Sequence, residues 1–147
     1  MSNDRTLIDA MLTTAKNIAV VGASDKPARA SYNIARYLMN SGYRVFPVNP
    51  VLKQVLGRPA SATLDEAVAA AQSETGRGID LVDVFRASEH VPPIVDDLLR
   101  LGIQSLWLQD GVTHPAAVAK ARAAGVSVVE DDCIFREHAA RPELLRK

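Results

Sequence analysis

Phosphate-binding chemistry is concentrated in one loop near the N-terminus. Residues 17–22 form a short apolar run that predicts a buried strand, and Gly22, Ser24, Arg29 and Ser31 lie at its end and in the following loop. Glycine allows a close approach of the backbone to a ligand, hydroxyl groups donate hydrogen bonds, and a guanidinium matches the geometry of phosphate oxygens. A helix is expected next, and its first amide groups would add donors at the positive end of the helix dipole.

Each of these residues also has an ordinary structural explanation. Gly22 is suited to a tight turn, Ser31 to a helix cap, and Arg29 to a solvated surface position. Because all of them fall in one loop after the first strand, we interpret the loop as a phosphate-binding site.

The end of the second predicted strand argues against NAD as the ligand. The chain has no G-x-G-x-x-G, and Asn49 and Pro50 occupy the place where an NAD-binding fold commonly has an acid for the ribose hydroxyls. The nearest downstream charge is Lys53. Since an acid would repel a ribose phosphate, this arrangement favours coenzyme A or NADP over NAD. An ordinary turn at Asn49 and Pro50 is the alternative.

The elements that would position these residues alternate along the chain. Nearly continuous apolar runs predict buried parallel strands at residues 17–22, 44–48, 79–85, 105–108 and 126–129. Amphipathic segments predict helices at residues 6–14, 32–41, 64–73, 88–101, 115–124 and 132–138. We therefore expect an α/β, Rossmann-like, doubly wound fold with a mainly parallel five-stranded sheet and helices on both faces. Its ligand site would lie beyond the carboxyl ends of the strands, at the switch point.

Length and composition exclude several classes of protein. The 147 residues, 48% of them hydrophobic, suit one domain over residues 1–147. Seventeen basic and seventeen acidic residues cancel, so we expect no nucleic-acid partner. No apolar run could span a bilayer and no signal pattern begins the chain, so we expect no membrane association and a cytoplasmic location. One cysteine cannot form an internal disulfide.

Residues for catalysis or metal binding do not converge in the sequence. His90, His114 and His138 are too widely spaced for a helical metal-binding pair. The acidic stretch at residues 130–132 before Cys133 is interpreted as a solvated turn that begins a helix, rather than as a metal site or an activated thiol. We expect no catalytic residue and no metal site.

The chain resembles the stand-alone coenzyme A-binding domain proteins, which are related to the coenzyme A-binding domain of succinyl-CoA ligase α subunits. The resemblance spans nearly the whole chain and is carried by Val21-Gly22-Ala23-Ser24, by Arg29 with Ser31, by residues 42–50 and 80–86, and by Trp107-Leu108-Gln109 followed by Gly111. It implies that Gly22, Ser24, Arg29 and Ser31 surround a pyrophosphate. It also implies that Asn49 and Pro50 lie near the adenosine.

The resemblance adds residues at the end of the third strand, and position along the chain adds residues after the fourth strand. Phe85 and Arg86 would line the third-strand edge of the site, with a structural Arg–Asp pair as the alternative for Arg86. Gln109 and Gly111 would line the pantetheine path; otherwise they form a turn toward the next helix. The candidate coenzyme A-binding residues are therefore Gly22, Ala23, Ser24, Arg29, Ser31, Asn49, Pro50, Lys53, Phe85, Arg86, Gln109 and Gly111.

The expected function is a binding module for coenzyme A or an acyl-CoA, with no catalysis of its own. One alternative is a subunit of an acyl-CoA ligase or transferase, whose ligase form needs a second domain with a phosphorylated histidine. Another is an NAD(P)-binding oxidoreductase or redox sensor, which needs the missing glycine fingerprint or a DNA-binding appendage. The sequence leaves open the physiological role, the choice between free coenzyme A and acyl-CoA, and any protein partner or homo-oligomer.

Overall fold

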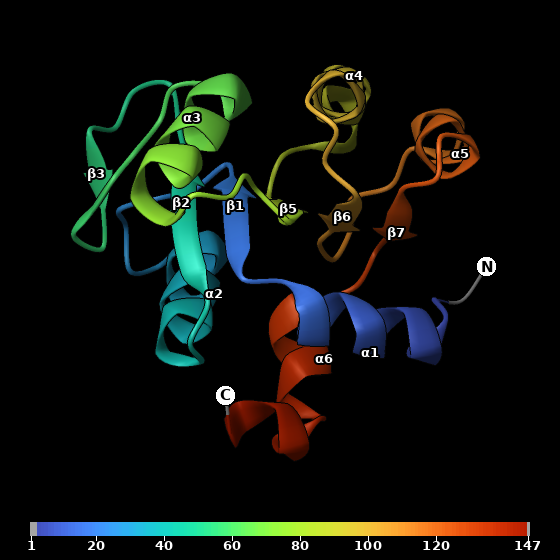
Figure 1. The fold of residues 1–147 in the computed structure, drawn as a ribbon, viewed down its shortest axis with the longest axis horizontal. Coiled ribbons are helices and arrows are strands. Elements are labelled where there is room, and N and C mark those ends of the chain that lie inside the picture. Colours follow the sequence, from blue (N-terminus) through green and yellow to red (C-terminus); the bar gives the residue numbers. More distant parts are fainter. Residues whose placement is uncertain (1–2, 147) are drawn as a thin grey trace.

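The structure, a computed structural model, describes residues 3–146, and its centre is a five-stranded parallel sheet (Figure 1). The strand order is β2-β1-β5-β6-β7, and every neighbouring pair is parallel. The strands are β1 (Asn17–Val21), β2 (Arg44–Val48), β5 (Leu81–Val84), β6 (Ser105–Leu108) and β7 (Ser127–Val129). The predicted strands are confirmed, each within two residues at either end.

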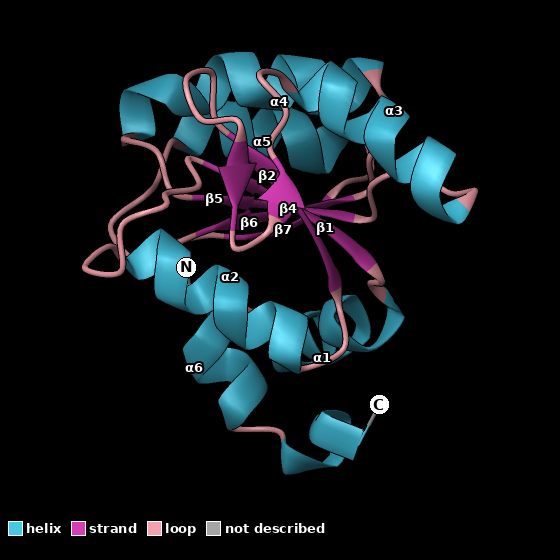
Figure 2. Cartoon of the chain, turned by 90° about the vertical axis from the view of Figure 1, so that its left-hand side faces the viewer, coloured by secondary structure: helices cyan, strands magenta, loops and turns pink. Residues whose placement is uncertain are grey.

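Helices cover both faces of this sheet, as Figure 2 shows edge-on. The helices are α1 (Arg5–Thr14), α2 (Ala30–Asn40), α3 (Leu64–Thr75), α4 (Val91–Arg100), α5 (Pro115–Ala123) and α6 (Ile134–Ala139), with short 3-10 turns at Ser88–His90 and Pro142–Arg146. Helices α3, α4 and α5 lie on one face, and α1, α2 and α6 lie on the other (Figures 1 and 2). The predicted α/β, Rossmann-like fold is confirmed. No helix in the described part of the chain is both long enough and apolar enough to cross a membrane.

Alternate strand residues divide the core into two layers. On β1, Ala19 and Val21 belong to the apolar cluster that includes α3, α4 and α5 residues. Ile18 and Val20 belong to the cluster that includes α1, α2 and α6 residues. Because both faces of the strand are buried, its residues from Ile18 to Val21 form a continuous apolar run rather than an alternating one.

A small hairpin between β2 and α3 was not predicted. Its strands, β3 (Gln54–Val55) and β4 (Arg58–Pro59), are antiparallel and only two residues long. Leu56 and Gly57 between them have φ values of 53° and 77°, the backbone of a turn with two left-handed residues. Strands this short contain no measurable hydrophobic period, and Leu56 is an unusual residue for such a turn.

The strand order creates a switch point at the carboxyl edge of β1. The chain leaves β1 for β2 on one side, and the later strand β5 pairs with β1 on the other side. The connections after β1 and after β5 therefore diverge. A crevice forms between such loops in open α/β sheets, and ligands bind there.

Candidate ligand-binding site

A cavity of about 550 Å³ lies at this switch point. The loops after β1, β2 and β5 and the first turn of α2 line it. The lining residues are Gly22, Ala23, Ser24, Asp25, Lys26, Arg29, Ala30, Ser31, Asn49, Pro50, Val51, Leu52, Phe85 and Arg86. The fold thus brings most of the predicted site residues to one cavity, although they come from three separate parts of the sequence.

Gly22 permits the ends of β1 and β5 to approach each other. It has a φ of +86°, and a Cβ atom at this position would lie 2.7 Å from the carbonyl oxygen of Phe85. The amide of Phe85 donates to the carbonyl of Val21 at 2.8 Å, so the end of β5 is hydrogen-bonded to the end of β1 directly beside Gly22. A side chain would therefore be strained here both by the backbone and by the contact.

The loop after β1 is folded by its own hydrogen bonds. The Ser24 hydroxyl accepts from the Lys26 amide at 3.0 Å, and the Arg29 amide donates to the Lys26 carbonyl at 2.9 Å. Asn33 on α2 donates through Nδ2 to the carbonyls of Pro27 at 2.8 Å and Arg29 at 3.1 Å. These bonds shape the loop around the cavity before any ligand enters.

Asn49 shapes the loop after β2. Its Oδ1 accepts from the amides of Val51 at 2.7 Å and Leu52 at 3.0 Å, and its Nδ2 donates to the carbonyl of Ala23 at 2.9 Å. The ordinary turn considered for this position is therefore present. Asn49 also lines the cavity, so the structural and ligand-binding roles are compatible.

The cavity has a local positive charge within a chain of zero net charge. Lys26, Arg29 and Arg86 line it, and Asp25 is the acid among the lining residues. Within the described residues none of these three cations forms an ion pair. Other basic side chains do form ion pairs, namely those of Arg44, Arg58, Arg77, Arg100, Lys120, Arg122, Arg136 and Arg141. Arg86 therefore does not form the Arg–Asp pair considered as its alternative.

The start of α2 adds hydrogen-bond donors to this charge. The helix begins at Ala30, two residues earlier than predicted, so Ser31 lies inside its first turn and is buried. Arg29 is the N-cap residue and makes no side-chain cap, whereas α1, α3 and α5 are capped by side chains. The first amides of α2 are thus without a side-chain acceptor at the wall of a cationic cavity, an arrangement suited to an anion.

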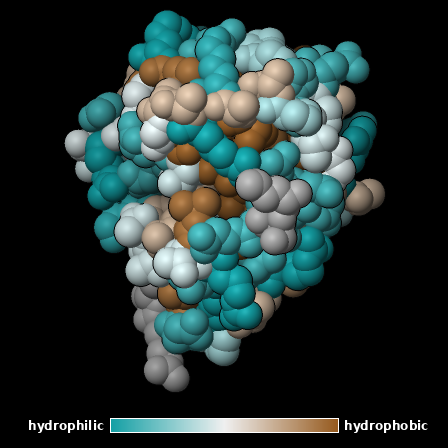
Figure 3. All heavy atoms as spheres, turned by 90° about the vertical axis from the view of Figure 1, so that its right-hand side faces the viewer, coloured by the Kyte–Doolittle hydropathy of each residue, from teal (hydrophilic) through white to brown (hydrophobic). Residues whose placement is uncertain are grey.

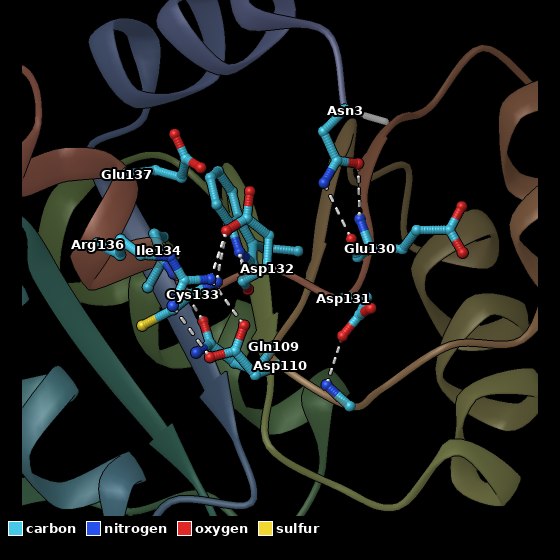
Figure 4. A network of polar contacts seen from close by, with 12 residues as sticks. Asn3, Gln109, Asp110, Glu130, Asp131, Asp132, Cys133, Ile134, Arg136 and Glu137 are labelled. Atoms are coloured by element: carbon cyan, nitrogen blue, oxygen red, sulfur yellow. Dashed lines mark hydrogen bonds and ion pairs between the residues drawn. The ribbon is translucent and has the colours of Figure 1, made fainter. Parts of the chain in front are cut away.

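Three predicted site residues do not line this cavity. Lys53 is exposed on the segment before β3. Gln109 is buried, and its Oε1 accepts from the amide of Ile134 at 3.1 Å (Figure 4). The amide of Gly111 donates to Oδ1 of Asp131 at 2.7 Å. Gln109 and Gly111 therefore join the loop after β6 to the segment before α6.

The acidic stretch before α6 differs from the solvated turn expected from the sequence. Asp132 is buried; its Oδ1 accepts from the Cys133 amide at 2.8 Å and from Nη2 of Arg136 at 2.9 Å (Figure 4). Its carbonyl accepts from the indole of Trp107 at 2.8 Å. Trp107 is fully buried, and Cys133 is also buried. Among the described residues no group of three or more His, Cys, Asp or Glu side chains is placed to hold a metal ion.

Asp83 is a buried acid that sequence reasoning missed. It lies on β5 in register with Val20 and Trp107, is fully buried, and has no hydrogen-bond partner for either carboxylate oxygen among the described residues. Burial raises the pKa of this carboxyl well above its usual range. The sequence signal that could have identified Asp83 is its position as an acidic residue inside an otherwise apolar strand.

A second cavity, of about 880 Å³, lies on another face of the molecule and contains none of the predicted site residues. It is lined by residues of α1, α5, α6 and the segment after β7, including Ile8, Val118, Arg122 and Glu137. Figure 3 shows apolar atoms exposed in a hollow on this face.

Comparisons with known proteins agree with the fold. The uncharacterized protein YneT of Bacillus subtilis is 34% identical over 132 residues, which are 90% of this chain and 92% of YneT. A hypothetical protein of Pyrococcus horikoshii has a TM-score of 0.82 and 32% identity, with 93% and 91% of the two chains covered. A dinucleotide-forming acetyl-coenzyme A synthetase of Candidatus Korarchaeum cryptofilum shares the fold, with a TM-score of 0.65, 22% identity, and 82% of this chain but 27% of the synthetase covered.

A family model described as a coenzyme A binding domain matches most of the chain. The matched region, residues 16–139, begins just before β1 and ends with α6. It therefore includes the whole parallel sheet and every loop that lines the cavity at the switch point. The chain belongs to the coenzyme A-binding domain family.

Proposed function

We propose that the cavity at the switch point binds coenzyme A or an acyl-CoA, and that the chain acts as a single-domain binding module. The observation that carries this proposal is the meeting of unpaired cations with the uncapped start of α2 in one cavity of about 550 Å³. Coenzyme A carries a pyrophosphate and a ribose phosphate, so a cationic, donor-rich cavity suits it.

The pyrophosphate would lie against the loop after β1. Gly22 leaves room for it, the hydroxyls of Ser24 and Ser31 and the first amides of α2 donate hydrogen bonds, and Arg29 supplies charge. These groups line the same cavity wall. Exposed Arg29 has no ion pair to break before it contacts a phosphate, so its full charge is available to the ligand.

The adenosine would lie against the loop after β2. Pro50, Val51 and Leu52 give this wall an apolar surface, and Val51 is 83% exposed. Asn49 offers no carboxylate to the ribose, so a ribose phosphate is not repelled there. This combination supports a coenzyme A ligand over NAD.

The lining residues also support a binding role over a catalytic one. In the described part of the chain, the titratable side chains of the cavity are those of Asp25, Lys26, Arg29 and Arg86. This set binds anions well but does not pair a nucleophile with a base. We therefore propose that the chain has no thioester-forming or thioester-cleaving activity of its own.

The direct test is the identity of the small molecule released when the purified protein is denatured. Mass spectrometry should find coenzyme A or an acyl-CoA in the supernatant. Release of NAD or NADP instead would show that the proposed ligand is wrong. A second measurement tests the binding-module proposal. Steady hydrolysis of acyl-CoA by the purified protein, if it disappears in Arg29→Ala, would contradict that proposal.

A further inference from the structure

A groove lies between α2 and α6, and α2 also contributes its first turn to the proposed coenzyme A cavity. The helices pack against each other beneath the sheet (Figure 1). The groove has a volume of about 320 Å³ and is lined by Asn33, Ile34, Arg36, Tyr37, Asn40 and Phe135. Phe135 is 44% exposed, and Val51 at the rim of the cavity is the other large apolar side chain that is exposed in the described part of the chain. The exposed apolar side chains thus mark the cavity and the groove.

The aromatic wall of this groove is held in place from behind. The Tyr37 ring meets the Phe135 ring edge to face, with centroids 4.7 Å apart. The Tyr37 hydroxyl is hydrogen-bonded to Nδ1 of His138 at 2.7 Å, and His138 is fully buried. The Tyr37 ring is thus anchored at its hydroxyl and packed against Phe135, so the two rings form one apolar surface, and a surface formed before binding lowers the entropic cost of binding an apolar group.

The cavity and the groove use residues on the same face of α2. Ala30 lines the cavity, and Ile34 and Tyr37 line the groove. Positions i, i+4 and i+7 lie on one side of a helix, and the rise of 1.5 Å per residue separates Ala30 from Tyr37 by about 10 Å along the axis.

Asn33 links the two sites more directly. It lines the groove, and its Nδ2 donates to the carbonyls of Pro27 and Arg29 in the loop after β1. A ligand that occupies both places would therefore contact one connected wall. None of the lining residues of the groove is acidic, and its charged member, Arg36, lies over the ring of Tyr32, with Cζ 5.6 Å from the ring centroid.

We propose that this groove receives the acyl chain of an aliphatic acyl-CoA whose nucleotide part lies in the switch-point cavity. The inference rests on the proposed function and narrows it, because it makes the preferred ligand a thioester with an apolar chain rather than free coenzyme A. Each methylene that enters the groove should tighten binding about fourfold, which corresponds to about 0.8 kcal/mol.

The test is calorimetric titration of the full chain with coenzyme A, acetyl-CoA and octanoyl-CoA. Octanoyl-CoA should bind at least about 10-fold more tightly than acetyl-CoA. In Phe135→Ser this advantage should disappear while the affinity for free coenzyme A stays unchanged. Phe135→Leu, which keeps an apolar side chain at the same exposed position, should retain most of the advantage.

The outcomes separate the two proposals. If none of the three compounds binds, the proposed function fails. If coenzyme A binds but chain length has no effect, or if Phe135→Ser keeps the full chain-length effect, the groove assignment is wrong and the proposed function stands.

A measurement on the unmodified protein tests the groove assignment even if the variants misfold. Amide chemical shifts that differ between coenzyme A and octanoyl-CoA complexes should cluster at Ile34, Tyr37 and Phe135. Differences that cluster instead at Val118 and Ala119 would place the chain in the 880 Å³ cavity and overturn the groove assignment.

Discussion

Asn49 ties the loop after β2 to the loop after β1, because its Nδ2 donates a hydrogen bond to the carbonyl oxygen of Ala23 at 2.9 Å. Both residues line the cavity, so this bond sets the separation of two of its walls. An aspartate could replace the Oδ1 interactions of Asn49 with the following amides, but it has no hydrogen to donate to Ala23.

Asn49→Asp should therefore weaken both the fold and the ligand site. A carboxylate facing the Ala23 carbonyl should lower the free energy of unfolding by about 1–3 kcal/mol, and its charge should reduce the affinity for a phosphate-containing ligand. Urea unfolding and calorimetry with coenzyme A measure the two effects. Gln104→Glu is the matched control, since exposed Gln104 also donates to a carbonyl, that of Gly102 at 3.2 Å, outside the cavity. Equal stability and affinity in Asn49→Asp and wild type would refute this role.

Gly22→Ala should destabilise the protein by about 3–4 kcal/mol, because the left-handed backbone is strained for alanine and the new Cβ would lie 2.7 Å from a backbone carbonyl oxygen, that of Phe85. Gly57→Ala is the control, since its φ is +77° and nothing lies within 4 Å of its added Cβ. That variant should lose only about 1–2 kcal/mol, the cost of the left-handed backbone. Equal losses in the two variants would show that the contact with Phe85 is unimportant.

Arg29→Ala should weaken coenzyme A binding by roughly 10- to 150-fold, which corresponds to about 1.5–3 kcal/mol for one charged hydrogen bond. The fold should be unaffected, because Arg29 is exposed and unpaired within the described residues. Calorimetry measures the affinity, and a thermal melt verifies folding. Lys16→Ala removes an exposed cation from the segment before β1, at the opposite edge of the sheet, and should leave binding unchanged. Unchanged affinity in folded Arg29→Ala would remove Arg29 from the site.

Coenzyme A should raise the melting midpoint more than NAD or NADP does. A ligand at about 100 times its dissociation constant stabilises the folded state by about 2.7 kcal/mol, which should shift the midpoint by at least about 5 °C. NAD should give a much smaller shift, because Asn49 offers no carboxylate to its ribose. NADP is the stricter comparison, since it also carries a ribose phosphate. A shift by either dinucleotide equal to that by coenzyme A, at the same concentration, would favour the dinucleotide alternative.

Asp83 should make the protein less stable as the pH rises. Its pKa is raised in the folded state, so the folded protein keeps a proton that the unfolded chain loses above about pH 4. This contribution is fully present below the unfolded pKa and is lost as the pH rises toward the folded pKa, by up to about 1.4 kcal/mol per pH unit.

Asp83→Asn tests this titration. The variant removes the ionisable group at nearly constant volume, so its stability relative to wild type should increase from pH 5 to pH 8 in urea unfolding experiments. A constant difference between the two proteins across this range would show that Asp83 does not titrate as its burial requires.

The local pattern of apolar and polar residues was enough to predict most of the secondary structure. Leu106, Trp107 and Leu108 of β6 form an apolar run that is buried on both faces, and such runs can be recognised without knowing their neighbours. The grouping of Gly22, Ser24, Arg29 and Ser31 around one cavity was also predicted from the sequence, because they follow a strand in a single short loop, and phosphate binding by this loop stays a prediction. Two-residue strands such as β3 have no such pattern, so the hairpin was missed.

Position in three dimensions was decided by contacts between distant residues. The sequence placed Gln109 after a strand, but only the packing of α6 turned its side chain toward the Ile134 amide and away from the cavity. Likewise, nothing local in the sequence shows that the carbonyl of Phe85 would face Gly22. The strand order and the register of β1 with β5 bring them together. A sequence records which residues favour a strand, a turn or a helix, whereas the pairing of strands is fixed by the burial of both faces of the whole sheet.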